Sequence, residues 1–193
     1  MKRTKKFTIP KNALKGKKGI LLDMDNTLYD YAACNDAGLI GSYEYLRKKK
    51  ELTFKDFKKK YLTAREKTKK QLNGLASSHS RLLNFQKLLE KIYGRTQAGM
   101  ALGAEKAYWD NFFKKMRIYP GVIDFLVESK KRGLKICLVT DLTVGVQFKK
   151  VISLGVEKYL DFIVSSEEAG ADKPHKKIFA LALKKLNLVP SEV

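Results

Sequence analysis

The stretch GILLDMDNTLYD, residues 19–30, is the one from which the fold of this chain follows. Its short apolar run, residues 20–22, predicts a buried strand that ends at Asp23, and Asp25 follows one residue later. A carboxylate at the end of a buried strand is costly unless a counter-charge compensates it. We therefore expect a cation beside Asp23 and Asp25.

The composition is that of a globular protein. The chain has 193 residues, of which 44% are hydrophobic, enough for one core or for a core that carries an insertion. Its two cysteines, Cys34 and Cys137, lie far apart, which indicates a reduced, cytoplasmic protein rather than a disulfide scaffold. The basic start of the chain is not followed by an apolar signal segment, and no apolar run is long enough to predict a membrane span.

The net charge of +20 is concentrated in two segments. Residues 1–20 hold eight lysines and arginines and no acid, and residues 47–70 hold twelve against three acids. Lysine dominates, whereas planar recognition of phosphate or guanine favours arginine. We favour a solvated, solubilising surface over nucleic-acid binding, which stays as the alternative.

Residues 31–116 have the pattern of a helical bundle. Thr53 is expected to cap a helix that carries Phe54, Phe57 and Tyr61 on one face. Two further apolar stripes follow at helical spacing and are typical of a bundle core rather than of a cofactor pocket: Leu82, Phe85, Leu89 and Ile92, then Ala104, Tyr108, Phe112 and Met116.

From residue 117 onward, strands alternate with helices, which predicts a parallel sheet covered on both faces. The expected strands are residues 134–140 and 161–166. The expected helices are residues 122–131, residues 144–154, and a third that Pro174 opens and that runs to residue 186. Residues 1–30 and 117–193 are thus predicted to form an α/β core, with residues 31–116 as an inserted helical domain.

Polar residues follow the predicted strands. Asp23 and Asp25 point to the same side of an extended segment, at the strand end where open α/β sheets place ligands. Thr140 ends the second strand, with Asp141 after it as the expected N-cap of the next helix. Lys173 precedes Pro174 at a predicted helix start, where the helix dipole favours an anion. Such a set suits a phosphate and Mg²⁺.

With these motifs the chain resembles the haloacid dehalogenase superfamily of phosphohydrolases. DMDNT is similar to its first motif, LVT to its second, the lysine of ADKP to its third, and the helical insert to its cap. The resemblance implies a Rossmann-like core, Asp23 as nucleophile, Asp25 as general acid and base, and Thr140 and Asp141 at the phosphate. It also implies Lys173 as charge stabiliser.

The same resemblance implies Mg²⁺ bound at Asp23 and Asp25, an aspartyl-phosphate intermediate, and a small phosphorylated metabolite as substrate. Dehalogenating members generally lack a carboxylate two residues after the nucleophile, so Asp25 favours phosphoryl chemistry. Because caps select substrates in this family, His79 and Arg81 are candidates to bind the leaving group of the substrate.

The family's fourth motif, an acidic cluster after a further strand, is missing from the chain, which stops 20 residues after Lys173. We therefore expect the Asp23 strand to be an edge strand and the chain as written to be weakly active or inactive. The alternative function is a catalytically inactive module that binds nucleic acid or another polyanion through the lysine-rich leader and a lysine-rich cap helix.

Overall fold

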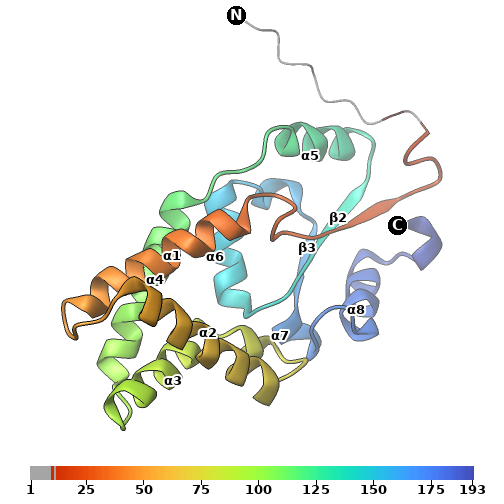
Figure 1. Cartoon of the computed structure of the whole chain (residues 1–193). Coiled ribbons are helices and arrows are strands. Elements are labelled where there is room, and N and C mark those ends of the chain that lie inside the picture. Colours follow the sequence, from red (N-terminus) through yellow and green to blue (C-terminus); the bar gives the residue numbers. More distant parts are fainter. Residues whose placement is uncertain (1–9, 11) are drawn as a thin grey trace, which may run out of the picture. The chain divides into compact units, whose positions relative to one another are not determined.

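The computed structural model describes residue 10 and residues 12–193, so most of the basic leader lies outside the described residues. The chain divides into two compact units (Figure 1). The α/β unit contains the described residues up to Tyr29 together with Arg117–Val193, and the helical unit contains Asp30–Met116. Asp30, which we had placed with the core, belongs to the helical unit because it caps its first helix.

The α/β unit is built on a three-stranded parallel sheet. Its strands are β1 (Gly19–Leu22), β2 (Lys135–Thr140) and β3 (Phe162–Ser165), hydrogen-bonded in that order. Leu22 pairs with Leu138, and Thr140 pairs with Ser165. Because all three strands run in the same direction, their carboxyl ends meet at one edge of the sheet. The predicted α/β fold class is confirmed.

Three helices of the α/β unit were expected. Helices α5 (Val122–Lys131) and α6 (Val144–Leu154) have the predicted bounds. The short α7 (Ser166–Ala169) was not predicted. Helix α8 runs over Lys176–Leu186, so the prediction that Pro174 opens this helix is wrong. His175 is its N-cap, because its Nδ1 accepts a hydrogen bond of 3.2 Å from the backbone N–H of Lys177.

Burial differs between the strands because of their places in the sheet. Every residue of β2 after Lys135 is buried, since β2 has a neighbour on both sides. In β1 only Gly19 is buried and residues 20–22 are half-buried, so our prediction of a buried strand is wrong there. Within the described residues β1 pairs with β2 alone, which makes it an edge strand, as expected.

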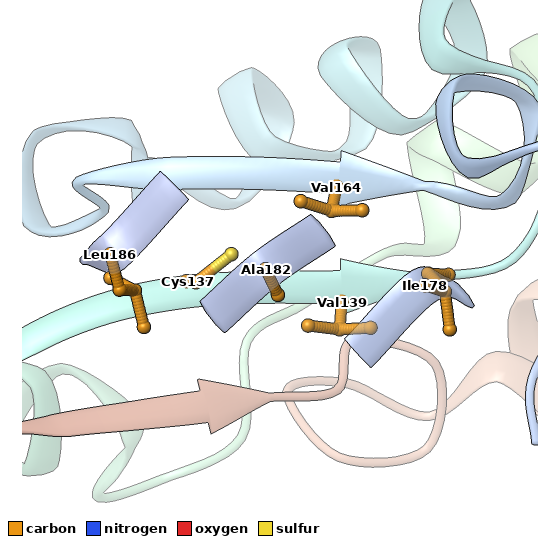
Figure 2. Packing of buried hydrophobic residues seen from close by; sticks show 6 residues of the cluster. All are labelled: Cys137, Val139, Val164, Ile178, Ala182 and Leu186. Carbon is orange, nitrogen blue, oxygen red and sulfur yellow. The ribbon is translucent and has the colours of Figure 1, made fainter. Parts of the chain in front are cut away.

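The core on one face of the sheet is formed with α8 (Figure 2). Its buried members come from β2, β3 and α8: Cys137, Val139, Val164, Ile178, Ala182 and Leu186. Cys34 and Cys137 are buried thiols that are not joined in a disulfide, as expected, and burial raises the pKa of Cys137 to about 12. Both cysteines therefore act as packing residues.

The helical unit contains α1 (Tyr31–Arg47), α2 (Phe54–Gln71), α3 (Arg81–Tyr93) and α4 (Ala98–Lys115), with a 3₁₀ turn at Ala76–His79. Thr53 caps α2 as predicted, since its hydroxyl accepts from the N–H of Asp56 at 3.2 Å. The predicted stripes meet in an aromatic core whose members are fully buried: Phe57, Tyr61, Phe85, Tyr108 and Phe112. No helix in the described part of the chain has the length and apolar character needed to cross a bilayer.

Helices α1 and α4 approach each other closely at Gly41. A Cβ atom on Gly41 would lie 2.7 Å from the carbonyl oxygen of Ala107, closer than real Cβ atoms come to backbone. By contrast, a Cβ atom on Gly99, near the start of α4, would meet nothing within 4 Å. The glycine at position 41 is therefore required by packing, and the one at position 99 is not.

We predict that Gly41→Ala lowers the free energy of unfolding by about 1–3 kcal/mol, because the helices must move apart to admit the methyl group. The matched control Gly99→Ala should leave stability unchanged or raise it by up to about 1 kcal/mol, since alanine favours a helix more than glycine does. Urea denaturation followed by circular dichroism measures both. Equal stability of the two variants would contradict the close approach.

Candidate active site

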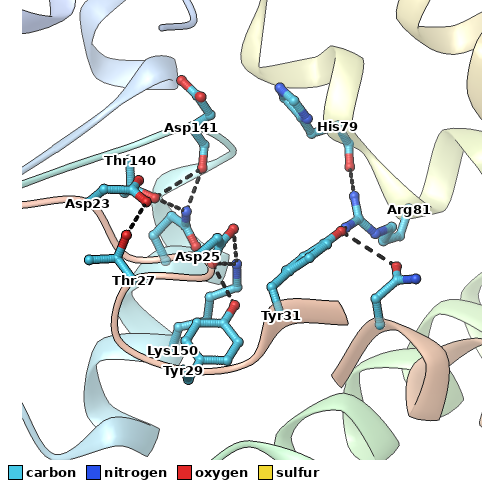
Figure 3. A network of polar contacts seen from close by, with 12 residues as sticks. Asp23, Asp25, Thr27, Tyr29, Tyr31, His79, Arg81, Thr140, Asp141 and Lys150 are labelled. Atoms are coloured by element: carbon cyan, nitrogen blue, oxygen red, sulfur yellow. Dashed lines mark hydrogen bonds and ion pairs between the residues drawn. The ribbon is translucent and has the colours of Figure 1, made fainter. Parts of the chain in front are cut away.

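Asp23 and Asp25 lie just beyond the carboxyl end of β1 (Figure 3). Met24 between them is fully buried, and the side chains of Asp23 and Asp25 are 40% and 33% exposed. The alternation along an extended segment places the methionine in the core and both carboxylates on the other side. Asn26 then turns the chain with a φ of 63°, a conformation that asparagine tolerates better than most residues.

Lys173 reaches Asp23 from the loop before α8. Its Nζ lies 2.5 Å from Oδ1 of Asp23 and donates to the carbonyl oxygen of Val139 at 3.1 Å. The hydroxyl of Thr27 donates to Oδ2 of Asp23 at 2.9 Å. The tertiary structure thus brings together the first and third predicted motifs, which are 150 residues apart in the chain.

Asp141 positions Lys173 rather than capping a helix. Its Oδ1 accepts a 2.8 Å hydrogen bond from the backbone N–H of Lys173. The N-cap of α6 is Thr143, so our prediction that Asp141 caps this helix is wrong. The residue between them, Leu142, has a φ of 97°, which a non-glycine residue rarely adopts and which marks a strained loop.

Thr140, at the end of β2, is held by a residue that the sequence did not single out. The side-chain amide of Gln147, fully buried on α6, donates to Oγ1 of Thr140 and to the carbonyl oxygen of Asp141, each at 2.5 Å. Thr140 accepts this bond and donates its own hydroxyl proton to the carbonyl oxygen of Asp141 over a long 3.5 Å. The pattern of α6 predicted a helix but did not show which polar residue faces inward.

Asp25 is held by two further residues that the sequence analysis missed. Lys150 of α6 places its Nζ 2.8 Å from Oδ1 and 3.0 Å from Oδ2 of Asp25 (Figure 3). The hydroxyl of Tyr29 donates to Oδ1 at 2.5 Å. Lys150 is 1% exposed, and its ammonium lies 5.9 Å from the ring centre of Tyr29. The expected counter-charges beside the two aspartates are therefore lysines.

The donor set also fits one hard cation. Mg²⁺ is commonly bound by one or two carboxylates, with water and substrate phosphate as the other ligands. A carboxylate has about four acceptor sites; Asp23 uses two of them here and Asp25 uses three. Among the described residues no cluster of three or more His, Cys, Asp or Glu could form a metal site by itself.

Arg81 lies in the helical unit, at the start of α3. Its guanidinium donates to the carbonyl oxygen of His79 at 2.6 Å and to the hydroxyl of Tyr31 at 2.5 Å. It also lies 5.3 Å and 5.7 Å from the ring centres of Tyr108 and Trp109.

The guanidinium of Arg81 is buried without a carboxylate. The residue is 6% exposed, and Nε has no hydrogen-bond partner. No acidic side chain of the described residues forms an ion pair with it. Burial raises the pKa of Tyr61 and of Tyr108, so these neighbouring phenols stay neutral and supply no counter-charge.

Comparison with known proteins agrees with this arrangement. A family model described as haloacid dehalogenase-like hydrolase matches residues 17–193. The chain belongs to this hydrolase family. The superfamily resemblance predicted from the three motifs is thereby confirmed.

Relatives in this hydrolase family are phosphatases. The chain is 35% identical over 177 residues to the ribulose-1,5-bisphosphate 5-phosphatase of Halopiger xanaduensis, a match that covers 90% of this chain and 73% of the relative. It is 29% identical over 175 residues to the glyceraldehyde 3-phosphate phosphatase of Methanopyrus kandleri, covering 91% of this chain and 72% of the relative.

Solved structures share the fold. A phosphatase of this family from Thermococcus onnurineus superposes with a TM-score of 0.68 at 20% identity, covering 91% of this chain and 74% of that one. A 2-haloacid dehalogenase from Pseudomonas syringae gives 0.67 at 18% identity, covering 91% and 75%. Because the fold is common to both chemistries, the residues of the site must decide between them.

Proposed function

We propose that this protein hydrolyses phosphate monoesters of small metabolites, with Asp23 as the nucleophile. One observation carries the proposal: the ammonium of Lys173 meets the carboxylate of Asp23 at the strand-end edge of the sheet, beside Asp25. A carboxylate nucleophile next to a second carboxylate suits phosphoryl transfer, and the phosphatase names of the relatives support that class.

In the proposed reaction an oxygen of Asp23 attacks phosphorus, and the bond between phosphorus and the ester oxygen breaks. Asp25 gives a proton to the departing alcohol. Water then attacks the aspartyl-phosphate and gives a proton back to Asp25, while the bond between phosphorus and Asp23 breaks. Free alcohol and inorganic phosphate leave, and both aspartates return to their starting states.

Lys173 and Thr140 are proposed to hold the phosphoryl group. The ammonium of Lys173 would offset the charge that develops on the phosphoryl oxygens. The hydroxyl of Thr140, whose present hydrogen bond to the carbonyl oxygen of Asp141 is a long one of 3.5 Å, would turn to donate to one of these oxygens instead. Asp141 supports both residues. Its carboxylate fixes the backbone of Lys173, and its carbonyl oxygen binds the same side-chain amide of Gln147 that contacts Thr140.

We further propose Mg²⁺ as the cofactor, held by Asp23 at its two remaining acceptor sites and beside Asp25, whose one remaining site is kept for the transferred proton. When bound, it would neutralise charge on the nucleophile and the phosphate, a role that lysines fill only in part. The two buried cysteines, which form no disulfide with each other, support the cytoplasmic location that we propose for the protein.

The helical unit is proposed to act as the cap that selects the substrate, with Arg81 as a binding residue for an anionic group. A buried guanidinium without a carboxylate is costly, and an anionic substrate group would supply the missing charge. Relatives named for ribulose bisphosphate and glyceraldehyde 3-phosphate support phosphorylated sugars as the substrate class.

A second candidate function is nucleic-acid binding by the helical unit. A groove of about 420 Å³ lies between α2 and α3 and is lined by Lys60, Lys67, Lys87 and Lys91, with Glu90 as the one acid. The hydrogen bonds from Gln86 and Thr96 to Glu90 lower the pKa of this acid, so it stays negative. The lysines nevertheless outnumber it, and a phosphate backbone is a fitting ligand.

We predict that Asp23→Asn abolishes hydrolysis of a sugar phosphate and the acid-stable labelling of the enzyme by ³²P-labelled substrate. The amide cannot attack phosphorus, so the fall in kcat should exceed about 1,000-fold. Asp124→Asn, an exposed position in the first turn of α5, serves as the control and should retain activity. Retained labelling in Asp23→Asn would exclude Asp23 as the nucleophile.

For Arg81, the expected effect is on substrate preference. Arg81→Lys keeps the charge but loses the forked donor geometry, so KM for a sugar bisphosphate should rise about tenfold or more. KM for a phosphate ester with a neutral alcohol should change little. Arg95→Lys, at an exposed position, is the control. An equal change for both substrates would assign Arg81 to packing alone.

If the groove binds nucleic acid, the affinity of the protein for a short DNA duplex should fall steeply between 50 and 200 mM salt. The affinity should fall roughly as one power of the salt concentration for each phosphate contact, and fluorescence anisotropy measures it. Replacing Lys60 and Lys67 by glutamine should reduce that slope by about two. Absence of binding at the lower salt concentration would identify these lysines as a solvated surface.

A further inference from the structure

We propose that Lys150 is a positioning residue, which holds the carboxylate of Asp25 in the orientation that proton transfer requires. The inference rests on the proposed function, because it concerns the acid and base steps assigned to Asp25. It adds a residue of α6 to a site that the sequence motifs place on the strand ends and on the loop before α8.

The contacts of Asp25 leave its carboxylate only one orientation. Lys150 bridges both oxygens, at 2.8 Å and 3.0 Å, and the hydroxyl of Tyr29 adds a second donor to Oδ1. Oδ1 therefore accepts two hydrogen bonds and Oδ2 accepts one. The remaining acceptor site of the carboxylate lies on Oδ2, which is the atom we assign to the transferred proton.

Burial is unequal within this ion pair. The side chain of Lys150 is 1% exposed, whereas that of Asp25 is 33% exposed. A lysine that is this deeply buried loses its hydration, and the loss is compensated only by good contacts with its partners. The pair is therefore built as a fixed ammonium beneath a carboxylate whose other side stays open to solvent and substrate.

Helix α6 holds this ammonium as part of a rigid face. Gln147 and Lys150 are three residues apart, so they lie on the same side of the helix, and both are buried. Gln147 holds Thr140 and the carbonyl of Asp141, while Lys150 holds Asp25. One helix face thus orients the ends of both β1 and β2, whereas Phe148 and Ile152 of α6 remain exposed.

A positioning role has a consequence that a purely structural ion pair lacks. An alkyl alcohol is a poor leaving group and needs a proton from Asp25 as its bond to phosphorus breaks. 4-Nitrophenol is a good leaving group and departs without that proton. Misplacing Asp25 should therefore slow transfer from an alkyl phosphate far more than transfer from 4-nitrophenyl phosphate.

The test compares kcat/KM for ethyl phosphate and 4-nitrophenyl phosphate, since this ratio reports the steps up to release of the alcohol. In Lys150→Met, which keeps the length of the side chain, we expect kcat/KM for ethyl phosphate to fall about 100-fold or more. For 4-nitrophenyl phosphate it should fall less than about threefold. Lys150→Arg should restore most of the loss, because it returns a cationic donor.

A second readout follows the water step, which also needs Asp25. Rapid mixing of Lys150→Met with 4-nitrophenyl phosphate should release a burst of one equivalent of 4-nitrophenol, followed by slow turnover as the aspartyl-phosphate accumulates. Tyr29→Phe, which removes the second donor to Oδ1, should shift the leaving-group ratio in the same direction by about tenfold. It keeps the proposal testable if Lys150→Met unfolds.

Lys149→Met is the matched control, an exposed neighbour on the same helix that should behave as the wild type. Equal losses for both esters in Lys150→Met, or in Tyr29→Phe, would overturn the positioning role. Unchanged rates would overturn it as well. If the wild type hydrolyses neither these esters nor a sugar phosphate, the proposed function itself fails and the inference falls with it, so the two failures are distinguishable.

Discussion

Two carboxylates separated by one residue repel each other, and at a strand end they also lose part of their hydration. Counter-charges must therefore come from elsewhere in the chain. Lys173 supplies one to Asp23 and Lys150 supplies the other to Asp25. The α/β unit is arranged so that a loop and a helix, both remote in sequence from β1, deliver these ammonium groups to its carboxyl end.

The two lysines are held in different ways, which suits different roles. Lys173 comes from a loop, is 24% exposed, and has its backbone fixed by Asp141. Lys150 comes from a helix, is almost fully buried, and lies beneath the carboxylate that it contacts. A partly exposed ammonium can also meet an incoming phosphate, whereas a buried one mainly determines where its partner points. Asp23 and Asp25 are thus distinguished by their lysines as well as by their places in the chain.

Much of the fold and of the candidate site could be predicted from local sequence patterns. The alternation in GILLDMDNT required Asp23 and Asp25 to share a side, and the strand–helix alternation after residue 117 required parallel strands whose ends meet. Thr140 was singled out by its position at a strand end, and Lys173 by its position just before a predicted helix start. The errors were also local in origin, because Asp141 and Pro174 are residue types that often begin helices. In the structure Asp141 instead accepts a hydrogen bond from the backbone N–H of Lys173, and His175 rather than Pro174 begins α8 as its N-cap.

The sequence by itself determined where the strands end to within one residue, because side-chain alternation and apolar runs act over a few neighbouring residues. Only the tertiary structure decided that Lys150 and Gln147 face the site and that Arg81 is buried without a carboxylate. In a chain with 40 lysines and arginines, composition cannot distinguish a buried cation from a solvated one. That distinction depends on which helix face packs inward, and therefore on tertiary contacts such as the one between Lys150 and Asp25, which are 125 positions apart.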